Sequence, residues 1–384
     1  MPFTINHLTA ILFGEGVANQ TGDSLKKYGV NKVLFVYDQG LKTTGIADKI
    51  IKNIKDNNIG VVEFDDVKPD PPSETVDAAG NLARKENVDA VLGIGGGSAM
   101  DTAKAVNVLL GNPGSIKDYM TGAPQKPGRL VFAMPTTAGT GSEVTNLAVV
   151  SNKEEGLKQG IPHPNCTPKL AIVDPELTLG LPPSLTAAGG MDAFSHAVEA
   201  YTGAFVNPMS DILALEAISL ITKYLPLAVK DGSNLEVRSK MSFASTTAGM
   251  AFNDAPPYLG HALAHAMGAV YHIPHGVGCG LALPIAIEYI SDFAPERVRN
   301  AGKAMGLQIS DGLSDKEAGK AVADAIRSMN KETGMPSLNA LGFDEDSLSE
   351  IVHEAKRDVC WQVFMPRETG EEEALELVKK EYFL

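Results

Sequence analysis

The chain has 384 residues, of which 44% are hydrophobic and 21% are charged, and its mean hydropathy is -0.03. These values are ordinary for a globular protein and exclude an intrinsically disordered chain. The 33 basic and 47 acidic residues give a formal net charge of -14, which opposes nonspecific binding to nucleic acid or to anionic membranes. We therefore expect neither nucleic acid nor a membrane as a partner.

The cellular compartment is indicated by the N-terminus and the cysteines. Residues 1–5 contain no basic stretch followed by an apolar run, so we expect no signal peptide. No uninterrupted apolar segment reaches the roughly 20 residues that a membrane-spanning helix needs. Cys166, Cys279 and Cys360 are far apart in the sequence and form no CxxC pair. This pattern predicts a cytoplasmic protein without disulfides or a structural zinc ribbon.

Short β-branched runs alternate with helical stretches through the first half of the chain. Strands are expected at residues 33–37, 61–64, 88–94 and 130–134, and helical segments at residues 49–57, 73–86 and 100–110. Such alternation predicts a parallel sheet covered by helices. Ligands of such sheets bind beyond the carboxyl ends of the strands.

A run of glycines follows the strand expected at 88–94, namely Gly95, Gly96 and Gly97, before Ser98. Glycines at this position let backbone amides approach a phosphate, and a helix N-terminus adds partial positive charge, so the run is a candidate pyrophosphate cradle. It matches neither the P-loop nor GxGxxG, because no Gly-Lys-Ser/Thr follows and Ser98 stands in place of the last glycine. The alternative is an ordinary turn in which Ser98 and Asp101 form a capping box.

Two further strand ends favour a nucleotide site. Asp38 ends the strand at 33–37, where a carboxylate can bind a ribose diol and repel a 2′-phosphate. The alternative role of Asp38 is that of a simple turn residue. After the strand at 130–134, residues 135–143 are rich in threonine, serine and glycine, and can donate hydrogen bonds to a nucleotide. Clusters of this composition are more often plain loops.

The second half carries acidic and imidazole side chains at helical spacing. The candidates are Asp192 and His196, His261 and His265, and then His275 in an expected rigid turn between proline and glycine. Residues at i and i+4 share one helical face. A carboxylate with imidazoles suits iron or zinc better than magnesium or calcium, so we predict a metal site between two helices. The alternative is a set of hydrogen-bonded core or surface histidines, although an unpaired buried imidazole costs about 1–3 kcal/mol.

These motifs together resemble the iron-dependent (group III) alcohol dehydrogenases over nearly the whole chain and in the same order. The segments that carry the resemblance are Gly95-Gly96-Gly97-Ser98 with Asp101 and Lys104, Pro135-Thr136-Thr137-Ala138-Gly139-Thr140-Gly141-Ser142-Glu143, Asp174-Pro175-Glu176-Leu177, Gly190-Met191-Asp192-Ala193 with His196 and Glu199, and His261, His265 and Pro274-His275-Gly276. One departure is Asp70, which stands where the family usually has an asparagine between two prolines.

The resemblance implies two domains and a cofactor. Residues 1–183 would form a dinucleotide-binding α/β domain with a parallel sheet, residues 184–384 an all-helical metal-binding and substrate domain, and the active site would lie in the cleft between them. The implied cofactors are Fe2+, with Zn2+ as a second candidate, and NAD(H), which Asp38 favours over NADP(H).

The resemblance also assigns roles to individual residues. The implied metal ligands, which we count with the catalytic set, are Asp192, His196, His261 and His275. His265 would lie beside the substrate and the nicotinamide and relay a proton. The implied cofactor-binding residues are Asp38 at the ribose, Gly95, Gly96, Gly97 and Ser98 at the pyrophosphate, Thr136, Thr137 and Thr140 along the cofactor cleft, and Asp101 and Lys158 near the nicotinamide.

We therefore expect a cytoplasmic, NAD-dependent, iron-containing alcohol dehydrogenase that interconverts a small primary alcohol and its aldehyde. The resemblance suggests a homodimer or higher homo-oligomer, with residues 10–13 pairing across the interface. Alternatives are a metal-independent reductase such as a maleylacetate reductase, a zinc-dependent polyol dehydrogenase or dehydroquinate-synthase-like lyase on the same fold, and a nucleotide-binding module without catalysis.

Overall fold

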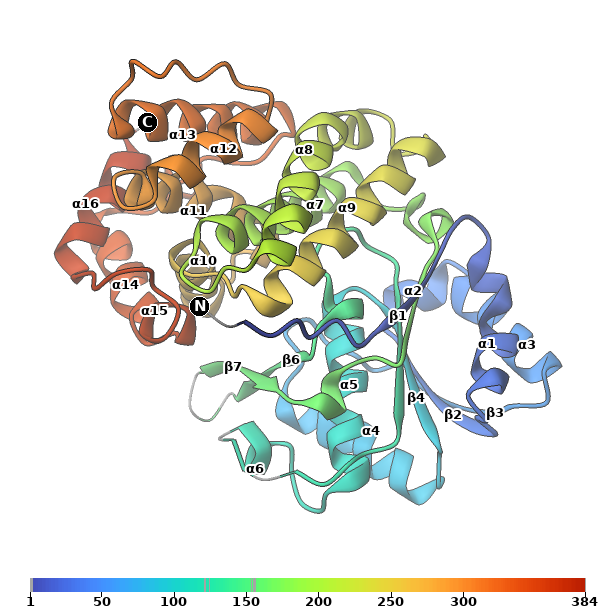
Figure 1. Cartoon of the computed structure of the whole chain (residues 1–384). Coiled ribbons are helices and arrows are strands. Elements are labelled where there is room, and N and C mark those ends of the chain that lie inside the picture. Colours follow the sequence, from blue (N-terminus) through green and yellow to red (C-terminus); the bar gives the residue numbers. More distant parts are fainter. Residues whose placement is uncertain (1–2, 121, 124, 153, 155–156, 384) are drawn as a thin grey trace. The chain divides into compact units, whose positions relative to one another are not determined.

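The computed structural model describes residues 3–120, 122–123, 125–152, 154 and 157–383, and its chain divides into two compact units (Figure 1). One unit is His7–Leu179. The other is Gly180–Leu384 together with Met1–Asn6. The assignment of separate roles to residues 1–183 and 184–384 stays a prediction.

The first unit is built on a six-stranded sheet in the order β1-β8-β5-β4-β2-β3, in which every neighbouring pair is parallel. The strands are β1 (Ala10–Phe13), β2 (Lys32–Val36), β3 (Gly60–Phe64), β4 (Ala90–Gly95), β5 (Leu130–Pro135) and β8 (Leu170–Val173). The predicted parallel sheet is confirmed. A separate antiparallel pair, β6 (Leu147–Asn152) and β7 (Leu157–Pro162), was not among the expected elements.

Helices cover both faces of this sheet because its strand residues alternate between two apolar cores. Leu34 and Val36 pack with α4 (Ser73–Lys85) and α5 (Gly97–Gly111), whereas Val33 and Phe35 pack with α1 (Thr21–Lys27) and α3 (Ile46–Asp56) (Figure 1). The remaining short helices of this unit are η1 (Val17–Gln20), α2 (Gln39–Thr43), α6 (Lys117–Met120), η2 (Ser142–Val144), η3 (Pro164–Cys166) and η4 (Pro175–Thr178).

Every element of regular structure that is described in residues 180–383 is a helix. Its helices are α7 (Pro183–Thr202), α8 (Pro208–Lys230), α9 (Leu235–Asp254), α10 (Leu259–Tyr271), α11 (His275–Ile290), α12 (Pro295–Ala304), α13 (Asp315–Glu332), η5 (Asn339–Leu341), α14 (Glu345–Ala355), α15 (Val359–Gln362) and α16 (Glu371–Tyr382). The predicted all-helical C-terminal region is confirmed. Helix α7 packs against α8, α9 and α11, and it is buried continuously from Gly190 to Thr202. Polar side chains on this stretch therefore lie in the interior.

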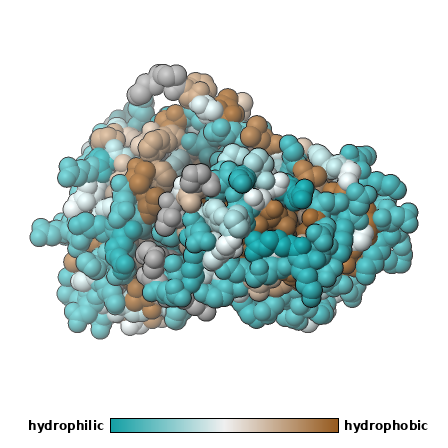
Figure 2. Space-filling view, turned by 90° about the horizontal axis from the view of Figure 1, so that it is seen from below, coloured by the Kyte–Doolittle hydropathy of each residue, from teal (hydrophilic) through white to brown (hydrophobic). Residues whose placement is uncertain are grey.

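Helix α8 is the one helix in the described residues that is long and apolar enough, by length and composition, to cross a membrane. Core helices of other proteins share this length and composition. Three charged residues, Asp211, Glu216 and Lys223, interrupt its apolar run. Asp211 pairs with both terminal nitrogens of Arg297 on α12, at 2.8 and 2.9 Å. On the face shown in Figure 2, hydrophilic residues predominate and hydrophobic ones gather in small patches.

Candidate active site

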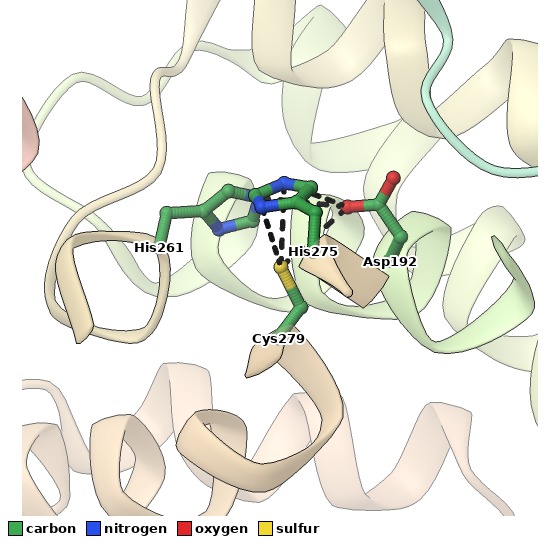
Figure 3. Close-up of side chains that lie close together, drawn as sticks. All are labelled: Asp192, His261, His275 and Cys279. Carbon is green, nitrogen blue, oxygen red and sulfur yellow. Dashed lines mark hydrogen bonds and ion pairs between the residues drawn. The ribbon is translucent and has the colours of Figure 1, made fainter. Parts of the chain in front are cut away.

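Four donor side chains meet inside the helical unit, namely Asp192 of α7, His261 of α10, and His275 and Cys279 of α11 (Figure 3). One ligand atom of each lies within 4.8 Å of the other three. Oδ1 of Asp192 is 3.4 Å from Nε2 of His275 and 3.9 Å from Nε2 of His261. Carboxylate, imidazole and thiol donors that face one another form a set suited to a divalent transition ion.

His196 lies beside this group, one helical turn after Asp192. Its Nδ1 is 3.7 Å from Oδ1 of Asp192, and its ring stacks on that of His261 with 4.5 Å between the centroids. Phe252 also stacks on His196, at 4.1 Å. The structure thus brings the four predicted ligands together, while their individual roles as ligands stay a prediction.

Close helix packing at Gly276 sets the position of His275. A Cβ atom on Gly276 would overlap the carbonyl oxygen of Ala188 on α7, so only glycine lets the start of α11 approach α7 this closely. The contact carries His275 toward Asp192. We expected His275 in a rigid turn, but it is the first residue of α11, and Pro274 is the N-cap of this helix.

The buried carboxylate of Glu199 orients His261. Glu199 lies on α7 with none of its surface exposed, and its Oε2 is 2.5 Å from Nδ1 of His261. Its Oε1 accepts hydrogen bonds from the amides of Tyr258 and Gly260, at 3.0 and 2.9 Å. Because a carboxylate only accepts hydrogen bonds, Nδ1 of His261 donates, and in the neutral ring Nε2 presents its lone pair.

The environment of His261 fits a bound cation. Nε2 of His261 is buried and has no hydrogen-bond partner among the described residues. Such an atom costs about 1–3 kcal/mol when it stays unpaired. Burial lowers the pKa of His261, but the neighbouring carboxylates of Glu199 and Asp192 raise it by more than burial lowers it. The net shift of this pKa is upward. Both observations describe a pocket that favours positive charge, which a divalent ion next to Asp192 would supply.

His265 lies outside the group of four donors. Its Nδ1 is 2.9 Å from Oδ2 of Asp358, and its ring stacks on His275 with 5.1 Å between the centroids. Oδ1 of Asp358 accepts a hydrogen bond from the amide of Cys360 at 2.7 Å and caps α15. Burial raises the pKa of Asp358, but His265 and these hydrogen bonds outweigh it and the net shift is downward. The His265 side chain is 21% exposed, against 3% for His261, so solvent and small molecules can reach it.

In the α/β unit, the glycine run that is predicted to cradle a phosphate lies where β4 meets α5. Helix α5 begins at Gly97 with Gly96 as the N-cap, and glycine has no side chain that could cap the first amides. A Cβ atom on Gly97 would lie 2.9 Å from Cγ2 of Thr140, and one on Gly96 would lie 3.7 Å from Cγ2 of Thr137. Residues 135–143, called the threonine loop below, therefore pack directly on the glycine turn at the start of α5. A helix N-terminus of this kind is a suitable place for an anion such as a pyrophosphate. Ser98 lies inside α5, so the capping-box alternative is wrong.

Residues that follow two neighbouring strands, β5 and β2, lie close to Gly95 at the end of β4. The amide of Thr136 donates to the carbonyl of Gly95 at 2.9 Å and holds the ends of β5 and β4 together. Asp38 caps α2, with its Oδ1 accepting from the amide of Leu41 at 2.8 Å. Its Oδ2 lies 3.4 Å from the position that a Cβ on Gly95 would take. Asp38 therefore has a turn role and also directs an oxygen toward the cradle.

A buried lysine joins α5 to the threonine loop. Nζ of Lys104 donates to the hydroxyls of Ser142 and Thr145, at 2.8 and 3.0 Å, and to the carbonyl of Leu147 at 2.8 Å. Asp101 lies 3.7 Å from Nζ and accepts from the hydroxyl of Ser142 at 2.6 Å. Burial raises the pKa of Asp101 and lowers that of Lys104. Asp101 thus belongs to an internal polar network, and its predicted position near the nicotinamide stays a prediction.

Lys158 forms an ion pair with Asp70, the residue that stands in place of the asparagine usual in the resembled family. Its Nζ donates to Oδ1 of Asp70 at 2.6 Å. Asp70 has a φ of 47°, in the left-handed region that aspartate and asparagine tolerate better than most residues. The acidic residue therefore keeps the backbone conformation and adds a negative partner for Lys158.

Three side chains of the site had no assigned role in the sequence analysis. Glu199 is on the same helical face as Asp192 and His196, and Cys279 is four residues after His275, so helical spacing alone could have indicated both. Asp358 is 93 residues from His265, and no local pattern links the two.

The fold and the site are those of a nucleotide-binding metalloenzyme, and comparison with known proteins identifies its family. The chain matches the family "Iron-containing alcohol dehydrogenase" over residues 9–175 and "Fe-containing alcohol dehydrogenase family, C-terminal" over residues 186–382. It is 38% identical to an NAD-dependent methanol dehydrogenase of Bacillus methanolicus, over 92% of this chain and 93% of that protein.

Solved structures agree with this match. An alcohol dehydrogenase from Oenococcus oeni superposes with a TM-score of 0.94 at 34% identity, covering 99% of this chain and 100% of that one. A sulfoacetaldehyde reductase from Bifidobacterium kashiwanohense in complex with NAD+ superposes with a TM-score of 0.90 at 32% identity, covering 100% of this chain and 99% of that one.

The chain therefore belongs to the iron-containing alcohol dehydrogenase family. It is an NAD-linked, metal-dependent oxidoreductase of small alcohols or aldehydes, as the sequence predicted. The alternative of a metal-independent reductase has no better support.

The Lys104 network yields a prediction about stability. Lys104→Met should lower the free energy of unfolding by about 3–5 kcal/mol, because it leaves buried Asp101 and the loop hydroxyls without their cation. Denaturant unfolding followed by circular dichroism measures the change. Lys85→Met, at an exposed position on α4, is the matched control and should have little effect. Equal stability of the Lys104→Met variant and the wild type would contradict this role.

Proposed function

We propose that this enzyme transfers hydride between NAD(H) and a small primary alcohol or aldehyde with Fe2+ as its metal, and with Zn2+ as the second candidate. The observation that carries the proposal concerns Nε2 of His261. This atom is buried, has no hydrogen-bond partner in the part of the chain that the structure describes, and lies 3.9 Å from Oδ1 of Asp192. The ligands in this proposal are Asp192, His196, His261 and His275. A divalent ion held there supplies Lewis-acid polarisation of the substrate oxygen, and the nicotinamide supplies or accepts the hydride.

In this proposal His265 moves the proton. Nδ1 of His265 donates to Asp358, so its Nε2 is the atom that can accept a proton from an alcohol or return one to the product, directly or through water. Its partial exposure leaves a route to solvent. His261 is held by Glu199 and buried, which makes it a poor carrier of protons.

The cofactor preference follows from Asp38 and the cradle. The carboxylate of Asp38 sits at the end of β2, where it can accept hydrogen bonds from a ribose diol and would repel a 2′-phosphate, so we propose NAD(H) over NADP(H). Gly95, Gly96, Gly97 and Ser98 would hold the pyrophosphate. Thr136, Thr137 and Thr140 would line the bound cofactor, and Asp101 and Lys158 would approach its nicotinamide end.

We also propose a cytoplasmic homodimer or larger homo-oligomer. Cys166, Cys279 and Cys360 form no disulfide with one another, which suits a reducing compartment. Strand β1 lies at one end of the strand order, and Ile11 on it is 38% exposed. A sheet edge with exposed apolar residues is a surface on which a second copy can pair.

The metal proposal predicts a reversible loss of activity. Chelation of enzyme purified without air should abolish NADH-dependent aldehyde reduction and leave NADH binding intact, because the cradle belongs to the other unit of the chain. Fe2+ should restore turnover, and addition of Zn2+ compares the second candidate. His261→Ala should retain no metal and show no recovery. Metal content, activity and NADH fluorescence are measured on the same samples. Activity that persists without metal would favour the metal-independent reductase instead.

The proton-transfer proposal makes a prediction about Asp358. In Asp358→Asn the side-chain oxygen can still cap α15, but the amide nitrogen would face Nδ1 of His265 and force the proton of the neutral ring onto Nε2. We expect kcat to fall by roughly 10-fold to 100-fold, with unchanged metal content and KM for NADH. Asp344→Asn makes the same change at the exposed cap of α14 and should be neutral. A wild-type kcat in Asp358→Asn would remove His265 from the relay.

A further inference from the structure

We propose that Cys279 is a direct ligand of the metal, bound through its thiolate, so that the centre combines carboxylate, imidazole and sulfur donors. The inference rests on the proposed metal site and adds a ligand to it. Sγ of Cys279 lies 3.6 Å from Oδ1 of Asp192 and 3.5 Å from Nε2 of His275. In Figure 3 the sulfur points toward the same space as the two imidazoles and the carboxylate.

The position of Cys279 follows from the start of α11. His275 and Cys279 are four residues apart on this helix, so both side chains project from one face. The packing at Gly276 that brings His275 to Asp192 therefore brings Cys279 as well. Cys279 has none of its surface exposed, so a role at the surface is not open to its thiol.

A second observation points to a ligand at this group of donors. Nε2 of His261, on a different helix, is buried without a hydrogen-bond partner among the described residues and lies 3.9 Å from Oδ1 of Asp192, and His261 belongs to the same group as Cys279. The four atoms come from three helices and are mutually within 4.8 Å. His196 is adjacent but is not a member of this group. Sγ of Cys279 therefore faces the same space as the donor atoms of Asp192, His261 and His275.

The chemistry of binding is a simple exchange. Without metal, the thiol can donate weakly to Oδ1 of Asp192. On metal binding the S–H bond breaks, its electron pair forms the sulfur–metal bond, and the proton leaves to solvent. No oxidant or reductant takes part. A thiolate makes the donor set softer, which favours zinc and cobalt over magnesium and calcium.

Cobalt spectroscopy tests the proposal without relying on turnover. Metal-free protein is loaded with Co2+ in the absence of air, and bound cobalt is counted. A thiolate ligand produces an intense sulfur-to-cobalt charge-transfer band in the near ultraviolet, which nitrogen and oxygen ligands do not. We expect this band in the wild type. It should be lost in Cys279→Ser, in which cobalt remains visible through its weaker d–d absorption.

The other two cysteines provide matched controls. Cys360 belongs to a second group with His265 and Asp358, and Cys166 is buried in the α/β unit. The double variant Cys166→Ser/Cys360→Ser keeps Cys279 as its only cysteine and should retain the full band. This variant decides the question even if Cys279→Ser does not fold, which thermal unfolding would reveal.

The outcomes separate this inference from the function proposed above. One cobalt ion per chain without a charge-transfer band would overturn the role of Cys279 and leave the metal-dependent function standing. Loss of the band in Cys360→Ser but not in Cys279→Ser would place the metal at the second group and also overturn it. Failure of the wild type to bind cobalt, zinc or iron would overturn both proposals.

Discussion

The contact between the Glu199 carboxylate and Nδ1 of His261 is the interaction on which the helical unit depends. Both groups are buried, and a carboxylate without a donor in such surroundings would be strongly destabilising. Two backbone amides donate to the other oxygen of Glu199 and hold the carboxylate in place. Because Nδ1 of His261 is engaged by Glu199, Nε2 is the ring nitrogen that can bind a metal. Orientation of a metal-binding imidazole by a carboxylate fixes the tautomer and raises the basicity of the ligating nitrogen.

Helix packing delivers the other donors to that nitrogen. Asp192 lies on the same buried helix as Glu199, and the glycine contact between α11 and α7 brings His275 and Cys279 to face it. In the α/β unit, the buried Lys104 has an equivalent role, because it ties Ser142 and Thr145 to α5. In both units a buried charge with fixed partners holds functional groups in place.

Much of the fold and of the candidate site could be predicted from the sequence, because the patterns that indicate them lie within short segments. The alternation of strands and helices predicted the parallel sheet, and the four-residue spacings predicted donors that the structure brings together. The phosphate-binding role of the glycine turn stays a prediction. The β6–β7 pair was missed because its strands carry little apolar alternation. The spacing of Cys279 from His275 becomes informative only once α11 is known to begin at His275, which places both side chains on one helical face. Asp358 and the glycine contact at Gly276 depend on packing between distant segments, which no single stretch of sequence encodes.

The most direct test of the central claim is the metal affinity of Glu199→Gln. In this variant the amide oxygen can still accept from the two backbone amides, but its nitrogen would face Nδ1 of His261 and place the ring proton on Nε2, where it blocks metal binding. We predict an affinity for Fe2+ or Zn2+ about 10-fold to 100-fold weaker than that of the wild type, measured by competition with a chelator. Glu216→Gln, at an exposed position on α8, is the control. An unchanged affinity in folded Glu199→Gln protein would contradict the account.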